Sequence, residues 1–171
     1  FSIPLIMTGV ISFFFFFGDR YFLRYYGSLS EIGIYSLAYK FGFLLMFVVV
    51  GPFMNHWDSE KFIFLKKPGA RETFRHIFLG YAAIVILFVV TVSLFARDLL
   101  RIMSDPSFWP AARLVPIIML AYIFNSWTAF SNLGLLAHNR TIEITYGTLV
   151  GAVVVGVAYI SLIPRYGSMG A

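Results

Sequence analysis

The sequence contains no cysteine among its 171 residues, and only 12% of its residues are charged. Without cysteine, the chain can form neither a disulfide framework nor a thiolate metal site. Its three histidines do not have HExxH spacing, and it contains no GxSxG element, P-loop or GxGxxG element. These absences argue against an enzyme. We expect no metal site and no cofactor.

Apolar residues are what the sequence has in excess. They make up 60% of the chain, and the mean hydropathy is +0.84. Ordinary globular domains hold about 45–50% apolar and about 25% charged residues. A soluble fold of 171 residues cannot bury this much apolar surface, because small domains have a high ratio of surface to volume. The composition therefore predicts a membrane protein.

Five apolar segments predict the membrane spans, and each is near the roughly 20 residues that a helix needs to cross about 30 Å of hydrocarbon. They cover residues 1–17, 32–53, 77–96, 112–136 and 142–163. The segments do not alternate between apolar and polar residues, as the strands of a transmembrane barrel do. We therefore predict an all-α, polytopic transmembrane helix bundle that forms a single domain over residues 1–171.

Glycine and proline predict where these helices break. Gly18 and Gly27–Ser28 close the first segment and open a turn. Gly51–Pro52 ends the second segment, because proline cannot continue the hydrogen-bond ladder. Pro116 is expected to kink the fourth helix one turn after its start, and Pro164 to end the fifth.

The loop charges predict how the chain is oriented in the membrane. The segment 55–76 holds five Lys and Arg residues against three acidic ones, so by the positive-inside rule it faces the cytoplasm, as does 137–141. The segments 18–31 and 96–111 then face outward. Within 57–67, basic and aromatic residues mix, which fits either an interfacial segment on anionic lipid or a plain connecting loop. The net charge of +5 favours anionic lipid headgroups as partners, and no motif indicates nucleic acid.

Charged residues at membrane depth are the main candidates for a functional site, because each costs about 2.5–3.5 kcal/mol at a helix centre. Lys40 lies about eight residues into the second segment, where it either snorkels to the interface or lines an aqueous cavity. Arg20 and Arg24 are four residues apart and project from one helical face, beside Asp19. These three are either interfacial anchors or part of the same cavity, and Asp19 and Arg20 could instead form a mutually compensating pair.

Polar residues and glycines in the last two segments predict contacts between helices. Asn125, Ser126, Ser131 and Asn132 give the fourth helix a polar side that either bonds to other helices or lines a sugar passage. Gly147 and Gly151 form a GxxxG element, which predicts that the fifth helix packs closely against a neighbour.

Three stretches resemble one family of transporters. GDRYFLRYYGSLSEIGIYSLAYKFG resembles an Asp-Arg-x-x-Leu element that is followed by a turn and Gly-Ile-Tyr-Ser-x-Ala. ARDLLRIMSDPSFWPAARLVPIIMLAYIF resembles the link between that family's ninth and tenth helices, and LIPRYGSMGA resembles the element before its twelfth. The family is the polysaccharide or O-antigen flippase branch of the multidrug/oligosaccharidyl-lipid/polysaccharide exporter superfamily, and the resemblance covers nearly the whole chain.

The resemblance implies that the chain is the C-terminal lobe, roughly helices seven to eleven, of a protein in the cytoplasmic membrane. Such proteins move a lipid-linked oligosaccharide, with a polyprenyl-pyrophosphate carrier, between leaflets by alternating access. Arg20, Arg24 and Lys40 match positions where cavity cations of the family hold the pyrophosphate or acidic sugars. The N-terminal lobe and the twelfth helix are absent from the sequence, so the fragment is not expected to transport alone.

Three other functions remain open from the sequence. One is a different exporter of the same superfamily for drugs or lipids, which favours acidic cavity residues where this chain has Lys40. The second is a membrane-embedded polysaccharide polymerase or ligase, which needs a large outward loop with catalytic Arg or His. The third is a purely structural membrane subunit.

Overall fold

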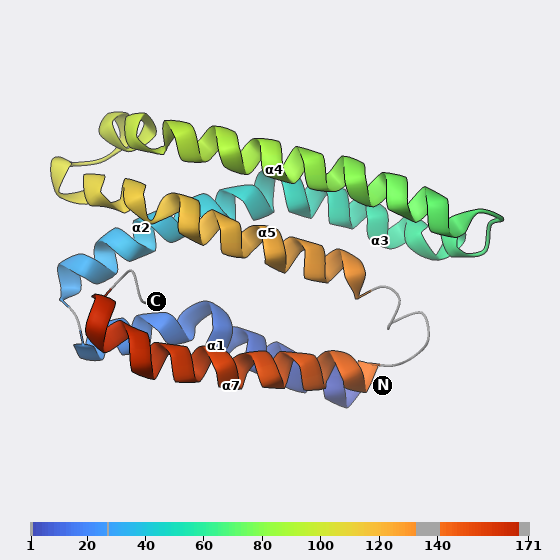
Figure 1. Ribbon diagram of the computed structural model, residues 1–171, viewed down its shortest axis with the longest axis horizontal. Coiled ribbons are helices and arrows are strands. Elements are labelled where there is room, and N and C mark those ends of the chain that lie inside the picture. The colour runs from blue at the N-terminus through green and yellow to red at the C-terminus, as the bar shows by residue number, and fades with distance from the viewer. Residues whose placement is uncertain (1, 27, 133–140, 168–171) are drawn as a thin grey trace. The chain divides into compact units, whose positions relative to one another are not determined.

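A computed structural model describes residues 2–26, 28–132 and 141–167, and the described residues form helices joined by short turns, with no strand among them (Figure 1). The α-helices are α1 (Ser2–Tyr26), α2 (Leu29–Leu45), α3 (Gly51–Leu65), α4 (Ala70–Met103), α5 (Val115–Ser131) and α7 (Thr141–Tyr166). A π-helical turn, η1 (Met46–Val50), joins α2 to α3, and a 3-10 helix, η2 (Pro106–Arg113), precedes α5. The all-α fold class is confirmed.

Three of the described stretches are long and apolar enough to cross a membrane. They are Leu29–Leu65, Ala70–Met103 and Ile142–Arg165, and η2 with α5 makes a fourth if this pair, bent by 48°, is one broken span. The second to fifth predicted spans fall in these stretches, apart from residues 133–136, which lie outside the described residues. The first predicted span falls in α1, and its crossing of the membrane stays a prediction. The chain is a multi-pass membrane protein.

The chain divides into two compact units. Unit 1 comprises Phe1–Tyr35 and Gly134–Ala171, and unit 2 comprises Ser36–Leu133. In unit 1, α1 and α7 lie side by side and run in the same direction (Figure 1). In unit 2, α4 packs against α3 on one side and α5 on another (Figure 1). A single domain over the whole chain stays a prediction.

The predicted break at Gly18 is wrong, because α1 continues through this residue to Tyr26. One glycine inside a helix costs only about 0.5–1 kcal/mol relative to alanine, so it does not end a helix by itself. The break falls at the other predicted position, Gly27–Ser28, of which Gly27 lies outside the described residues. There Ser28 and Glu31 form a reciprocal capping box before α2. The Ser28 N–H donates to Glu31 Oε2 (3.1 Å), and the Glu31 N–H donates to Ser28 Oγ (3.2 Å).

The prolines also behave differently from the prediction. The helix continues through Gly51–Pro52 by way of η1, so the second span runs on to Leu65. Pro116 lies in the first turn of α5, where no N–H is needed, and the 48° bend precedes it. Pro164 lies inside α7, which ends at Tyr166, and the next residue, Gly167, has a φ of +57°. Glycine accepts this left-handed conformation without strain, as is usual just after a helix.

The predicted cytoplasmic loop at 55–76 is mostly helix. The segment 57–67 is not a plain connecting loop, because α3 continues to Leu65 and only residues 66–69 form a turn. Its role as an interfacial segment on anionic lipid stays a prediction, since such segments are themselves helices. Polar residues at helical spacing do not break a helix, and Lys61 pairs with Asp58 one turn before it. Likewise α4 continues to Met103 in the predicted outer loop at 96–111, and segment 137–141 lies mainly outside the described residues.

Candidate functional site

Asp19 lies in the interior of unit 1. Its side chain has no solvent exposure, and the hydroxyl of Tyr35, itself buried, donates to Asp19 Oδ2 at 2.6 Å. The backbone N–H of Arg20 donates to Asp19 Oδ1 at 2.7 Å, and Arg20 Nη1 lies 3.5 Å from the same oxygen. Because Tyr35 belongs to α2 and Asp19 to α1, this carboxylate joins the two helices.

The surrounding contacts explain why Asp19 is buried. Asp19 and Leu23 lie one turn apart on α1, and both are fully buried. On α7, Tyr159 and Ile163 are also one turn apart and buried. The rings of Phe22 and Tyr159 lie 5.6 Å apart. Asp19 and Leu23 are therefore buried beside the face of α1 that meets Tyr159 of α7, whereas the sequence analysis listed Asp19 among the candidate cavity residues.

The two arginines of α1 have different surroundings. Arg20 is half-buried, and its guanidinium lies over the ring of Phe17, with 5.4 Å between Cζ and the ring centroid. Arg24 is exposed. Both arginines belong to unit 1, whereas Lys40 belongs to unit 2, so neither unit by itself brings the three predicted cations together.

Lys40 is exposed on α2 and makes no ion pair or hydrogen bond with the part of the chain that the structure describes. It shares a helical stripe with Phe43 and Phe47, which are 46% and 82% exposed. On the opposite side of α2, Gly42 lies against Tyr122 of α5. A Cβ atom at Gly42 would be 2.3 Å from Tyr122 Cε2, so only glycine allows this approach.

The predicted polar side of α5 is divided between two environments. Asn125 is exposed, and Asn132 is half-buried at the end of the helix, where its N–H donates to the Thr128 carbonyl at 3.0 Å. Ser126 is fully buried, and its hydroxyl donates to the Ile123 carbonyl at 2.8 Å. The described residues therefore do not gather Asn125 and Asn132 with Ser126 on one face.

The turn η1 is a feature that the sequence analysis missed. Gly51 donates its N–H to the Met46 carbonyl, five residues earlier, and a Cβ atom on Gly51 would lie 2.9 Å from that oxygen. Pro52 follows and has no N–H to donate. The Gly-Pro pair is the signal that could have predicted it, because a π-turn gives a proline inside a helix room that an α-helical turn does not. Turns of this kind are frequent at functional sites.

An aromatic cluster in unit 2, defined as Phe53, Trp57, Tyr81 and Phe130, was also missed. Trp57 stacks on Phe130 with 5.1 Å between ring centroids, and Phe53 stacks on Tyr81 at 4.2 Å. Trp57 is 4% exposed, yet its Nε1 has no hydrogen-bond partner among the described residues. The i, i+4 spacing of Phe53 and Trp57 is a signal that could have indicated a shared buried face.

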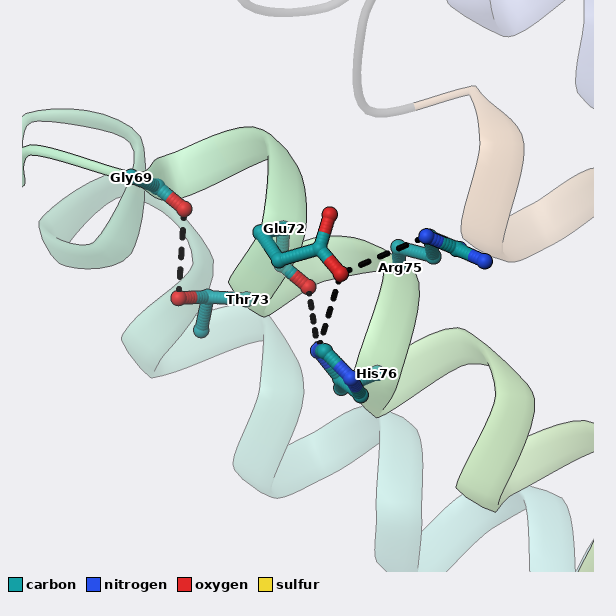
Figure 2. Close-up of polar contacts among 5 residues, drawn as sticks. All are labelled: Gly69, Glu72, Thr73, Arg75 and His76. Carbon is teal, nitrogen blue, oxygen red and sulfur yellow. Dashed lines mark hydrogen bonds and ion pairs between the residues drawn. The ribbon is translucent and has the colours of Figure 1, made fainter.

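Before the predicted apolar segment 77–96, polar contacts gather at the beginning of α4 (Figure 2). Glu72 Oε1 lies 3.3 Å from Arg75 Nη1 and 3.6 Å from His76 Nδ1, and the Thr73 hydroxyl donates to the Gly69 carbonyl at 3.4 Å. The side chains of Glu72, Arg75 and His76 are each more than half exposed, which is typical of a solvated helix start. Before η2, the Ser107 N–H donates to Asp105 Oδ1 and holds the pKa of that carboxyl below its usual value.

Gly147 does not pack closely against a neighbour, because it is exposed and a Cβ atom there would have nothing within 4 Å among the described residues. Within unit 1 the described residues therefore give Gly147 no close neighbour, and packing of the GxxxG element against another part of the protein stays a prediction. The neighbouring exposed residues of α7 include Tyr146, Val150, Val153 and Val157, each more than 60% exposed. They give this side of α7 an apolar surface of the kind that lipid covers.

Comparisons with protein-family models, with curated proteins and with solved structures find no match for this chain. The resemblance to the flippase family therefore stays a prediction. Any functional conclusion rests on the residues and their geometry.

Proposed function

We propose that the chain is part of a transporter that moves a lipid-linked oligosaccharide across the cytoplasmic membrane by alternating access. The carrier would be a polyprenyl pyrophosphate, and the remaining partners would be membrane lipids and an N-terminal lobe of the same protein. The observation that carries this proposal is Lys40, an exposed cation without a described partner on the stretch Leu29–Leu65. The three sequence stretches that resemble flippases support it.

The depth of Lys40 follows from contacts within unit 2. Tyr81, which stacks on Phe53, lies four residues inside the predicted hydrocarbon edge at Ile77, or about 6 Å at 1.5 Å per residue. Lys40 precedes Phe53 by thirteen residues on the same helical stretch, or about 20 Å. Lys40 therefore lies about 26 Å from the inner edge of a hydrocarbon layer about 30 Å thick. On the predicted orientation, it is close to the outer surface.

This depth suits the last stage of the proposed transport. A flipped lipid has to bring its pyrophosphate to the outer headgroup level while its tail stays in hydrocarbon. An ammonium group a few ångströms below that level attracts the doubly charged linkage where screening by water is weak. Arg24, exposed near the end of α1, is the second cation proposed for this role. Asp19 acts differently here, because it holds α1 against α2.

Replacing Lys40 tests the proposal. In the full-length protein at native level in a deletion strain, Lys40→Ala is expected to slow surface polysaccharide export roughly tenfold to a hundredfold. That range corresponds to about 1.5–3 kcal/mol for a contact with a charged group. Lys40→Arg keeps the charge and is expected to retain much of the export rate.

Lys66→Ala is the matched control, because Lys66 is also exposed but lies in the turn between α3 and α4. It is expected to export normally. Full export by Lys40→Ala would identify Lys40 as a snorkelling anchor and overturn the proposal.

A further inference from the structure

The turn η1 leaves a backbone acceptor without its usual donors. In an α-helix the Phe47 carbonyl accepts from residue 51, but the Gly51 N–H donates to Met46 instead. In a π-helix the Phe47 carbonyl accepts from residue 52, which is proline and has no N–H. Within this stretch of the described helix, neither ladder supplies the Phe47 carbonyl with a donor.

Counted from the predicted hydrocarbon edge at Ile77, this carbonyl falls close to the middle of the membrane. Phe47 precedes Phe53 by six residues, or about 9 Å, and Phe53 stacks on Tyr81, about 6 Å inside the predicted inner edge. The sum of about 15 Å is half the thickness of the hydrocarbon layer. In transporters with broken helices, sites formed by unwound backbone carbonyls lie at this depth.

The residue that carries this carbonyl is also largely uncovered within unit 2. Phe47 is 82% exposed and the neighbouring Val48 is 49% exposed. Lipid tails offer no hydrogen-bond donor, and an unsatisfied backbone group in hydrocarbon costs several kcal/mol. Irregular backbone at this depth is tolerated only where protein buries it or where it lines a hydrated cavity.

We infer that the Phe47 carbonyl is a binding site for a hydroxyl donor on a hydrated path through the protein. The donor is either water or a sugar hydroxyl of the transported glycan, and both have the same O–H chemistry. Lys40 lies two turns away on the same stripe of the helix, so the stripe offers an acceptor at mid-membrane and a cation near the outer surface. The inference deepens the transport proposal and rests on it only for the identity of the donor.

Single cysteines test whether this stripe is hydrated, and the chain provides a clean background because it has no cysteine of its own. Phe47→Cys is compared with Leu87→Cys in a cysteine-free full-length protein reconstituted into liposomes. Leu87 is 68% exposed on α4 and lies ten residues from Ile77, or about 15 Å, so its depth matches that of Phe47. Reaction with a water-soluble maleimide requires a thiolate, which forms only in contact with water.

The expected result is that Phe47→Cys is labelled and Leu87→Cys is not. Absence of labelling at both positions would mean that another part of the protein buries the carbonyl, and this would overturn the inference. Equal labelling at both would mean that the depth or the hydration is not specific to the stripe, which would overturn it as well.

Pro52→Ala separates the role of the carbonyl from that of the surface around it. Alanine restores an N–H, so the helix can close and the Phe47 carbonyl regains a donor. In the Phe47→Cys background, Pro52→Ala is expected to abolish labelling, while the melting temperature stays the same or rises. Labelling that persists at full rate would show that the water path does not depend on this acceptor.

A protection experiment then distinguishes the two donors. The labelling rate at position 47 is measured with a polyprenyl-pyrophosphate oligosaccharide and with polyprenyl phosphate that carries no sugar. Protection by the first alone assigns the donor as a glycan hydroxyl. Equal rates with both assign it as water. In that case the carbonyl site stands, while the glycan transport proposal loses support.

Discussion

The two units hold their helices together by different interactions. In unit 1, a buried carboxylate joins α1 to α2 through the Tyr35 hydroxyl. In unit 2, stacked aromatic rings and the close approach of Gly42 to Tyr122 hold the helices together, and no ion pair lies inside this core among the described residues. A membrane interior gains little from apolar burial, so helices rely on hydrogen bonds or on close packing. In this chain, unit 1 relies on a hydrogen bond and unit 2 on close packing.

The largest difference between the units is expected when Asp19 is removed. Asp19→Ala leaves the Tyr35 hydroxyl and the half-buried Arg20 without this acceptor. We expect the free energy of unfolding to fall by about 3 kcal/mol, the low end for breaking a buried pair, because Arg20 is partly exposed. Thermal unfolding in detergent measures it. Asp19→Asn keeps an acceptor and is expected to lose less stability. An unchanged melting temperature for Asp19→Ala would mean that the hydrogen bond between Tyr35 and Asp19 does not stabilise unit 1.

A smaller effect is expected from steric overlap in unit 2. Gly42→Ala places a methyl group 2.3 Å from Tyr122 Cε2, and the ring has to move within a packed interior. Overpacking of this kind costs about 1–3 kcal/mol. The matched control is Gly80→Ala on α4, where a Cβ atom meets nothing within 4 Å, and it is expected to stabilise the helix by about 0.5–1 kcal/mol.

The double variant Gly42→Ala/Tyr122→Ala sharpens this test. If the contact is the cause, the second substitution makes room for the first, and the two effects do not add. Additive losses of stability would show that Gly42 acts through something other than this ring.

The smallest effect is expected at the start of α4, which lies in neither core (Figure 2). Glu72→Gln removes a carboxylate from the first helical turn and its contact with Arg75, and the loss is expected to stay below about 1 kcal/mol. Arg71→Gln in the same turn is the control and is expected to stabilise slightly, because it removes a positive charge from the positive end of the helix dipole. Both effects should shrink as salt is added, and salt-independent shifts would contradict this electrostatic origin.

The sequence allowed the helical class and three of the spans to be predicted, with a fourth if η2 and α5 form one broken span, since both depend on local composition. Lys40 could likewise be singled out, because a cation in an apolar run is visible without a structure. The breaks at Gly18, at Gly51–Pro52 and at Pro164 could not be located by residue type alone. Whether a glycine or proline ends a helix depends on the alternative hydrogen bonds nearby, such as the bond from Gly51 to Met46.

Composition and spacing by themselves determined that this is a helical membrane protein, because apolar runs of about 20 residues are stable as membrane-spanning helices. They also set the candidate cations, Arg20, Arg24 and Lys40. Only the tertiary structure decided that Asp19 is buried while Arg24 and Lys40 are exposed. Burial depends on which helix covers a face, and the contact of Asp19 with Tyr35 joins residues sixteen positions apart across a helix break. Local periodicity carries no information on such contacts.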